Sequence, residues 1–227
     1  REGNPSRTSG VVAKGLVYTY HAYSELGLVS SETAKWAGRF LEELERGRLL
    51  KWHRLFRFPL ARYFFRLVEK CGIPGLALHQ SIRKHLIATE TSKLLGDENN
   101  ALVVIGGGLD SLALQQSAAS SRQKIVELDH PSTQQVKKTV LKSYATDASA
   151  LQLAEFDASK DSLHEVLACL DSASIKQAVF ICEGVLMYLP EEKVRNLLEQ
   201  VATAAPKVTL IFTFMDQSHH GSWHFAE

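Results

Sequence analysis

An apolar run that ends in three consecutive glycines is the feature that most restricts how this chain can fold. Residues 101–115 read ALVVIGGGLDSLALQ, so a strand-like segment runs into Gly106, Gly107 and Gly108 and then into a helix-like segment. Such a turn presents bare backbone N–H groups at a helix N-terminus, where a nucleotide-type ligand can approach closely. The alternative is a tight turn that needs positive φ angles and binds nothing.

The chain from residue 101 onward alternates short apolar runs with amphipathic stretches, as parallel α/β sheets do. Pro131 and Pro190 suit first-turn helix positions, and Ser162 to Glu165 fits a capping box. We therefore predict an α/β fold with a doubly wound, Rossmann-like sheet. The expected strands are at about 101–105, 124–128, 150–154, 177–182 and 208–214, with helices near 110–119, 131–143, 161–170 and 190–204.

The first part of the chain, up to about residue 95, has helical periodicity and no convincing strand pattern. Its clearest helix could be capped by Ser31 and stopped by Gly47. We expect a helical cap or lid over residues 1–96 and a ligand-binding α/β core over residues 97–227, integrated into one domain.

The residues after the glycines argue against a dinucleotide. A dinucleotide fingerprint needs a third glycine where this chain has Ser111, and the carboxylate of Asp110 would repel a pyrophosphate. The same carboxylate is acceptable beside the α-amino group of S-adenosylmethionine, which carries no phosphate. An alternative role for Asp110 is to cap the helix that follows.

Two acids end the second predicted strand. Glu127 and Asp129 lie about twenty residues beyond the glycines, the spacing at which an acid meets a ribose in nucleotide-binding βαβ units. Strand alternation puts both side chains on one side of the chain. The alternative is that one of them caps the helix that starts at Pro131.

The fourth predicted strand ends in ICEGVLMYLPEE, residues 181–192. Ligands of open α/β sheets bind at the carboxyl ends of the strands, where Glu183 lies. A carboxylate and an aromatic ring, Tyr188, would stabilise a sulfonium or ammonium group by charge pairing and cation–π attraction. Alternatively, Tyr188 only packs beneath the next helix.

Composition excludes several classes of function. The net charge of +1 gives no global reason to expect nucleic acid or an anionic membrane as a partner. The three cysteines lack metal-ligand spacing, apolar runs are too short to span a membrane, and we expect a cytoplasmic protein. The cluster HHGSWH, which holds His219, His220 and His224, has no spacing that supports a metal site.

The basic, aromatic stretch 46–66 is interpreted as an amphipathic helix pair with a solvated positive face that suits an anionic acceptor.

Three ordered motifs carry a resemblance to a known family. VVIGGGLDSLALQ, VELDHPSTQQVKK and CEGVLMYLPEEKVRNLL resemble the leucine carboxyl methyltransferase family of S-adenosylmethionine-dependent O-methyltransferases, which includes bacterial members of uncertain substrate. SRTSGVVA near Ser6 and SIRKHLI around Arg83 are similar to further signatures of that family. The resemblance spans roughly Ser6 to Met215.

The resemblance implies a cofactor site. Arg83 would pair with the cofactor carboxylate, with Lys14 as a weaker candidate, and Gly106 and Gly108 would line the backbone cradle. Asp129, with Glu127 nearby, would hold the ribose. Either Glu155 or Asp157 would contact the adenine, and Glu183 would face the amino-acid end.

The resemblance also implies a reaction: methyl transfer from S-adenosylmethionine to an oxygen, with S-adenosylhomocysteine as product. A carboxylate acceptor, on a small molecule or at a protein C-terminus, is ionised at neutral pH and needs no general base. The alternatives are a nicotinamide-dependent oxidoreductase and a non-catalytic cofactor-binding scaffold. The methyltransferase fold needs two strands after the fifth, but only 13 residues follow VTLIFTF. We expect either that the sequence is a fragment or that the sheet lacks its last strands and much of the acceptor pocket.

Overall fold

The computed structural model describes residues 7–96, 100–119, 123–144, 150–168, 175 and 177–214. The described chain forms two compact units. The helical unit contains residues 7–88 and 109–111, and the sheet unit contains the other described residues.

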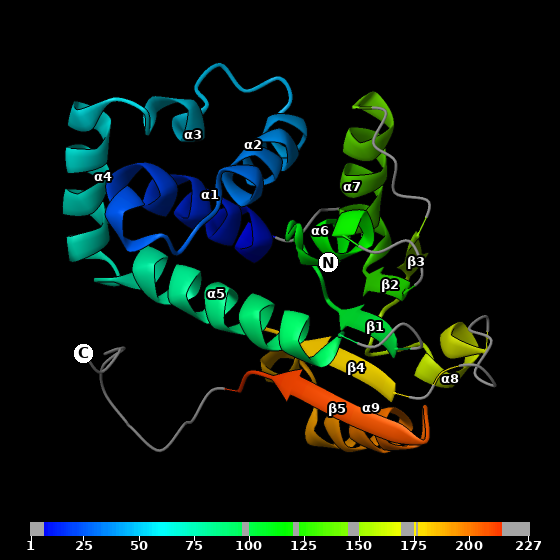
Figure 1. The fold of residues 1–227 in the computed structure, drawn as a ribbon. Helices are drawn as coiled ribbons and strands as arrows, with labels where there is room; N and C mark the ends of the chain where they lie inside the picture. The colour runs from blue at the N-terminus through cyan, green and yellow to red at the C-terminus, as the bar shows by residue number, and fades with distance from the viewer. Residues whose placement is uncertain are drawn as a thin grey trace. The chain divides into compact units, whose positions relative to one another are not determined.

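The helical unit is built from amphipathic helices around an aromatic core. Tyr18 on the first helix lies edge-on to Phe56, with ring centroids 5.5 Å apart, and 4.5 Å from the ring of Phe65. Figure 1 shows the elements, which are α1 (Arg7–Ala22), η1 (Ser24–Leu26), α2 (Ser31–Leu44), α3 (Trp52–Leu55), α4 (Pro59–Cys71) and α5 (Leu76–Leu94), whose last residues belong to the sheet unit. The helical texture predicted for this part of the chain is confirmed.

The cap of α2 differs from the prediction by one residue. Ser30, not Ser31, is the N-cap, and its Oγ accepts a hydrogen bond from the Thr33 N–H at 3.0 Å. The helix ends at Leu44, before Gly47.

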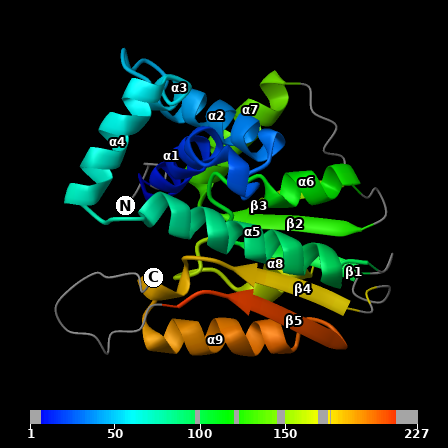
Figure 2. The ribbon, with the colours of Figure 1, turned by 60° about the vertical axis from the view of Figure 1, so that its left-hand side comes forward.

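The sheet unit contains five parallel strands in the order β3-β2-β1-β4-β5. They are β1 (Asn100–Ile105), β2 (Lys124–Asp129), β3 (Leu151–Glu155), β4 (Gln177–Cys182) and β5 (Lys207–Phe212). Their arrows point the same way in Figure 2, so all the carboxyl ends meet at one edge. This is the doubly wound α/β fold that the alternating texture predicts.

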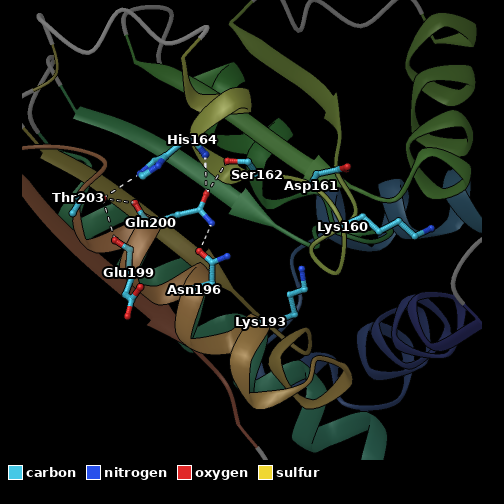
Figure 3. A pocket seen from close by; sticks show the side chains of 9 residues that line it. All are labelled: Lys160, Asp161, Ser162, His164, Lys193, Asn196, Glu199, Gln200 and Thr203. Atoms are coloured by element: carbon cyan, nitrogen blue, oxygen red, sulfur yellow. Dashed lines mark hydrogen bonds between the residues drawn. The ribbon is translucent and has the colours of Figure 1, made fainter.

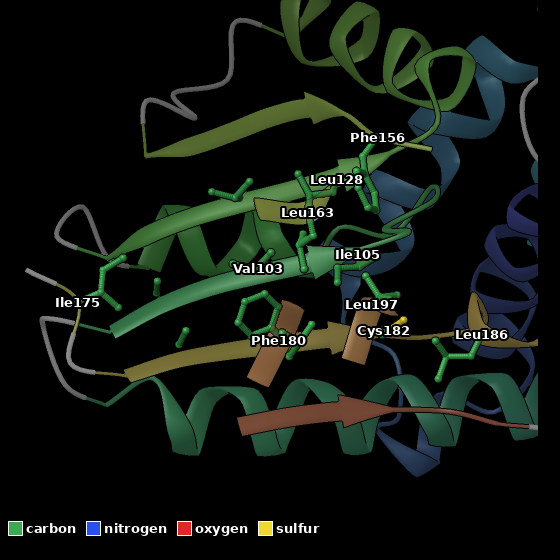
Figure 4. Close-up of a cluster of buried hydrophobic side chains, with 14 residues drawn as sticks. Val103, Ile105, Leu128, Phe156, Leu163, Ile175, Phe180, Cys182, Leu186 and Leu197 are labelled. Carbon is green, nitrogen blue, oxygen red and sulfur yellow. The ribbon is translucent and has the colours of Figure 1, made fainter. Parts of the chain in front are cut away.

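Helices cover both faces of the sheet. The helices α6 (Leu112–Ala119) and α7 (Pro131–Ser143) contact β2 and β3 on one face. On the other face, α8 (Leu163–Leu167) and α9 (Glu191–Ala202) pack over an apolar cluster that includes Val103, Leu128 and Phe180 (Figure 4). This burial of both faces explains why the strands read as continuous apolar runs.

Three helix starts were predicted from proline or capping signals, and the structure confirms one of them. Pro131 takes a first-turn position of α7, as predicted. Pro190 is instead the N-cap of α9, with a ψ of 152° that is extended rather than helical. The capping box at α8 is wrong: the Ser162 side chain makes no cap bond, and its Oγ donates to Gln200 Oε1 at 3.2 Å.

Some expectations fall on residues 215–227, which lie outside the described part of the chain. They are the absence of the last strands and the histidine cluster HHGSWH. Within the described residues, no group of three or more His, Cys, Asp or Glu side chains is arranged to hold a metal ion. A search of those same residues finds no helix with the length and apolar character that a bilayer span requires.

Candidate functional site

The glycine loop after β1 takes the conformation that only glycine adopts easily. Gly106 has a φ of +72° and Gly108 a φ of +59°. A Cβ on Gly106 would overlap Val185 Cγ2, and a Cβ on Gly107 would lie 2.5 Å from Glu127 Cδ. The protein's own packing therefore requires two of the three glycines, in addition to any demand that a ligand makes.

Asp129 ends β2 with its carboxylate held against this loop. Its Oδ2 accepts a hydrogen bond from the Gly108 N–H, and its Oδ1 accepts one from the His130 N–H at 2.6 Å. Burial raises the pKa of Asp129, although these two N–H groups and the charge of Lys137 oppose the rise. Each carboxylate oxygen has two acceptor positions, so the two bonds leave room for two more donors, such as neighbouring hydroxyls of a ribose.

Glu127 lies on the same side of β2, as alternation predicts, but in a different environment. Its side chain is 2% exposed and forms an ion pair with Lys137, whose side chain is 1% exposed. The alternative that an acid caps α7 is wrong, because His130 is the N-cap and accepts a hydrogen bond from the Ser132 N–H. The two acids thus have separate partners.

The two candidate adenine contacts after β3 are also used differently. Glu155 is the register partner of Asp129, and its carboxylate lies 3.1 Å from Lys138 Nζ. Asp157 accepts hydrogen bonds from the Ser159 hydroxyl at 2.6 Å and the Ser159 N–H at 3.0 Å. The hydroxyl bond contributes most to the lowered pKa of Asp157, and Lys160 adds to it. Both acids are at the carboxyl edge, and the choice between them stays open.

Glu183 directly follows β4 at the same edge. Cys182 before it pairs in register with Ile105 of β1, so Glu183 follows β4 where Gly106 follows β1. Burial raises the pKa of the Cys182 thiol to about 12, which leaves it protonated and unreactive at neutral pH. Tyr188 lies on the short helix η3 (Leu186–Tyr188) and is 57% exposed.

The remaining predicted site residues belong to the helical unit, and their roles toward a cofactor stay predictions. Arg83 lies on α5. Its neighbour Lys84 forms an ion pair with Asp110, with Nζ and Oδ2 2.6 Å apart. The predicted repulsion by Asp110 is therefore partly neutralised within the unit. Lys14 on α1 lies 2.6 Å from the carboxylate of Glu45, which is 3% exposed.

The basic stretch 46–66 is largely exposed, as predicted, but part of its charge is compensated. Glu42 on α2 accepts hydrogen bonds from Lys51, His53 and Arg54. Burial alone would raise the pKa of Glu42, but the bonds from Arg54, Lys51 and His53 outweigh it and lower the pKa to about 2. The sequence window contains no acid, and the compensating carboxylate comes from the preceding helix, while most of the remaining arginines form the exposed positive face.

A groove of about 510 Å³ lies between the segment before α8 and the helix α9 (Figure 3). Gln200 organises it: its Oε1 accepts from the His164 N–H at 3.0 Å, and its Nε2 donates to Asn196 at 2.8 Å. None of the predicted site residues lines this groove, whose polar groups largely bond to one another.

Sequence reasoning missed two residues of the glycine site, Lys137 and Val185. The signal for Lys137 was its place between Val136 and Val140 on the inward side of α7. Charged residues are rarely buried unless they are paired, so an inward lysine needs an acid such as Glu127. No local signal could identify Val185, because its contact with Gly106 joins loops about eighty residues apart.

Several known proteins are similar to parts of this chain. The chain is 26% identical over 118 residues to the putative S-adenosyl-L-methionine-dependent methyltransferase YktD of Bacillus subtilis (strain 168), which covers 51% of this chain and 38% of YktD. Among solved structures, the methyltransferase SibL in its apo form matches with a TM-score of 0.41 and 16% identity, over 83% of this chain and 53% of SibL. Human N-acetylserotonin methyltransferase in complex with SAM matches with a TM-score of 0.40 and 17% identity, over 83% of this chain and 52% of that one.

These alignments span well under two thirds of each relative's own length. The family comparison covers more of the chain itself. The model of the leucine carboxyl methyltransferase family matches residues 35–202, which include the glycine loop, both acids of β2 and Glu183. On that match, the chain belongs to the leucine carboxyl methyltransferase family.

Proposed function

We propose that this protein is an S-adenosylmethionine-dependent O-methyltransferase that transfers the methyl group to a carboxylate. The observation that carries the proposal is the state of Asp129 at the end of β2. Two backbone N–H groups orient its carboxylate, and each oxygen keeps an acceptor position for a ribose hydroxyl. Membership of the family supplies the cofactor class.

The residues at the carboxyl edge of the sheet would form the cofactor site. Asp129 would receive the ribose, and the backbone of Gly106 and Gly108 would line the cradle. Glu183 would pair with the α-amino group of the cofactor. The adenine contact would come from Glu155 or Asp157.

Bound S-adenosylmethionine supplies an electrophilic methyl group on a sulfonium. The residues of this chain would orient the cofactor and exclude water, because in-line displacement depends on alignment more than on proton transfer. Glu183 and Tyr188 would stabilise positive charge at the cofactor, by charge pairing and by cation–π attraction. A carboxylate acceptor would need no general base, since its pKa of about 4 leaves it ionised at neutral pH.

A nicotinamide-dependent oxidoreductase is not favoured. Ser111 occupies the position where the pyrophosphate fingerprint needs its third glycine. The nicotinamide cofactor therefore serves as the negative control in the test below.

The first test is calorimetric titration with S-adenosylmethionine, S-adenosylhomocysteine and NADH. We expect the two sulfur compounds to bind and NADH not to bind. Asp129→Asn should weaken binding at least about tenfold, because the amide offers fewer acceptor positions to the ribose. Glu191→Gln, an exposed change on α9, should bind as the wild type does. Binding of NADH alone would refute the proposal.

The second test identifies the acceptor atom. The protein is incubated with S-adenosylmethionine labelled in the methyl group and with a panel of small carboxylic acids, alcohols and peptides with free or amidated C-termini. Methyl esters release labelled methanol in mild base, whereas methyl ethers do not. Label that resists base would limit the proposal to O-methylation of hydroxyl groups.

A further inference from the structure

The buried ion pair behind the glycine loop has no part in the proposed chemistry as described so far. Lys137 and Glu127 have side chains 1% and 2% exposed, on α7 and β2 of the sheet unit. Burying two charges costs desolvation free energy, and apolar residues of similar volume often give equal or greater stability. The stability of the fold alone therefore does not explain why this pair is charged.

The position of the pair connects it to the loop. The Glu127 carboxylate occupies the space beside Gly107, where a Cβ would lie 2.8 Å from Oε1. The Lys137 ammonium pairs with that same Oε1. A change in the side chain of Lys137 would therefore act on the carboxylate that lies against the Gly107 backbone.

The helix that carries Lys137 is itself anchored to the strands. Gln134, one turn before Lys137, donates through Nε2 to the carbonyl oxygen of Glu127 at 3.0 Å and to that of Ala154 at 3.2 Å. The ammonium of Lys137 is thus held at a fixed position relative to the carboxyl ends of β2 and β3.

We propose that Lys137 is a positioning residue of the cofactor site. Its ammonium holds Glu127 against the Gly107 backbone, and the next residue, Gly108, donates its N–H to Asp129, so the ion pair fixes the loop that orients the ribose acceptor. This inference rests on the proposed function, since Asp129 is its point of action.

The electrostatics of Asp129 support the proposal. Burial raises the pKa of Asp129, and Lys137 is among the groups that oppose the rise. The other ionisable groups near Asp129 are Glu127 on β2, His130 at the start of α7 and Glu155 on β3. Without Lys137, the pKa of Asp129 would rise further, so a larger fraction of Asp129 would be protonated and unable to accept two hydroxyl donors.

The test uses three variants: Lys137→Met, Lys137→Met/Glu127→Gln and, as a control, Lys142→Met on the exposed side of the same helix. The double variant also replaces the Glu127 carboxylate, because its buried negative charge could unfold the single variant. For each folded protein, S-adenosylhomocysteine affinity is measured against pH, and the unfolding midpoint in urea is measured in parallel.

We expect the double variant to unfold near the wild-type midpoint but to bind about tenfold more weakly, because the charged pair that fixes the Gly107 backbone is gone. Since it removes one positive and one negative charge, its pH profile should stay close to that of the wild type. Lys142→Met should match the wild type in both measurements. A double variant with wild-type affinity would overturn the proposal, because the pair would then be a replaceable part of the core. An unfolded double variant would also overturn it, because folding would then depend on the charges.

A measurement without the cofactor separates this inference from the proposed function. Carboxyl-carbon NMR follows the titration of Asp129 in the ligand-free proteins. A higher Asp129 midpoint in Lys137→Met than in the wild type supports the coupling to Lys137, and an unchanged midpoint refutes it. If Lys137→Met shows this rise but the wild type binds neither sulfur compound, the proposed function fails while the link between Lys137 and Asp129 stands.

Discussion

The two units hold acid clusters with opposite charge balance. In the helical unit, Glu42 and Glu45 are surrounded by basic side chains from α1, α3 and the segment that connects α2 to α3: Lys14, Arg48, Lys51, His53 and Arg54. In the sheet unit, the ammonium of Lys137 is buried with Glu127 and also acts on Asp129.

The difference shows how charge can be used for structure or for a site. The Glu42 carboxylate is saturated by hydrogen bonds from Lys51, His53 and Arg54, and the ion pairs of Glu42 and Glu45 join α1, α2 and α3. At the sheet edge, the positive charge is committed to Glu127, and Asp129 relies on neutral N–H donors that leave acceptor positions open. An acid that keeps open hydrogen-bond acceptor positions is thus a better candidate for binding a ligand than an acid whose oxygens are all bonded to cations.

The largest expected effect comes from removing the buried cation. Lys137→Met removes the cation that forms an ion pair with the buried Glu127, which should lower the free energy of unfolding by about 3–5 kcal/mol. Urea denaturation of the single variant and of Lys137→Met/Glu127→Gln measures this, and the second change should recover most of the loss. A loss below about 1 kcal/mol in the single variant would mean that water or another cation reaches Glu127.

The next effect compares a crowded glycine with an open one. Gly106→Ala puts a Cβ into Val185 at a φ of +72°, and should cost about 2–4 kcal/mol. Gly47→Ala in the helical unit has a φ of +83° but no atom within 4 Å of its Cβ, so it should cost only about 1 kcal/mol. Thermal or urea unfolding of both variants gives the difference, and equal losses would show that conformation rather than Val185 requires Gly106.

Neutralising Glu42 in the helical unit should lower the free energy of unfolding by a smaller amount, and this loss should depend on pH. The pKa of Glu42 is lowered from 4.5 to about 2, so its contribution to stability is complete above pH 4.5 and is lost as the pH falls toward 2. Glu42→Gln should cost about 2 kcal/mol at pH 7, reduced from the full pKa shift because part of the side chain is exposed.

The matched control for Glu42 is its neighbour. Glu43→Gln removes only a 3.5 Å contact with Arg46, which is 78% exposed, and should change stability by less than about 0.5 kcal/mol. Urea unfolding at pH 7 and pH 2 compares the two variants. If Glu42→Gln loses as much stability relative to the wild type at pH 2 as at pH 7, the ion pairs of Glu42 do not stabilise the helical unit.

The smallest effect should come from the lysine next to the buried one. Lys138 pairs with Glu155 at 3.1 Å, but the two side chains are 39% and 52% exposed. Lys138→Met should therefore change the free energy of unfolding by less than about 0.5 kcal/mol, about a tenth of the effect at Lys137. A large loss would show that α7 is held to β3 by this exposed pair as well.

Secondary structure could be read from the sequence because its signals are local. The five strands and the helices between them are close to their expected ranges, since apolar runs and amphipathic periods report which faces are buried. The helix caps were less predictable. Ser30 replaces Ser31 and His130 replaces an acid at α7, because several neighbouring residues can cap and the backbone path decides between them.

The residues of the candidate site could be predicted from the sequence, but the contacts that they make could not. Gly106, Asp129 and Glu183 were identified because each ends or directly follows a strand, and the carboxyl ends of parallel strands share an edge. Their partners come from elsewhere in the chain. Lys137 binds Glu127 from ten residues away and Val185 covers Gly106 from the β4 loop, neither of which a local motif specifies.

From the sequence alone follow the α/β class, the positions of the strands and the acids at their carboxyl ends, because these depend on periodicity and on short motifs. Only the tertiary structure decided which acid is used in a buried ion pair and which keeps acceptor positions for a ligand. Glu127 and Asp129 are two residues apart and chemically alike, yet burial beside Lys137 commits one, while two backbone N–H groups leave the other with open acceptor positions. That distinction depends on groups brought together by folding.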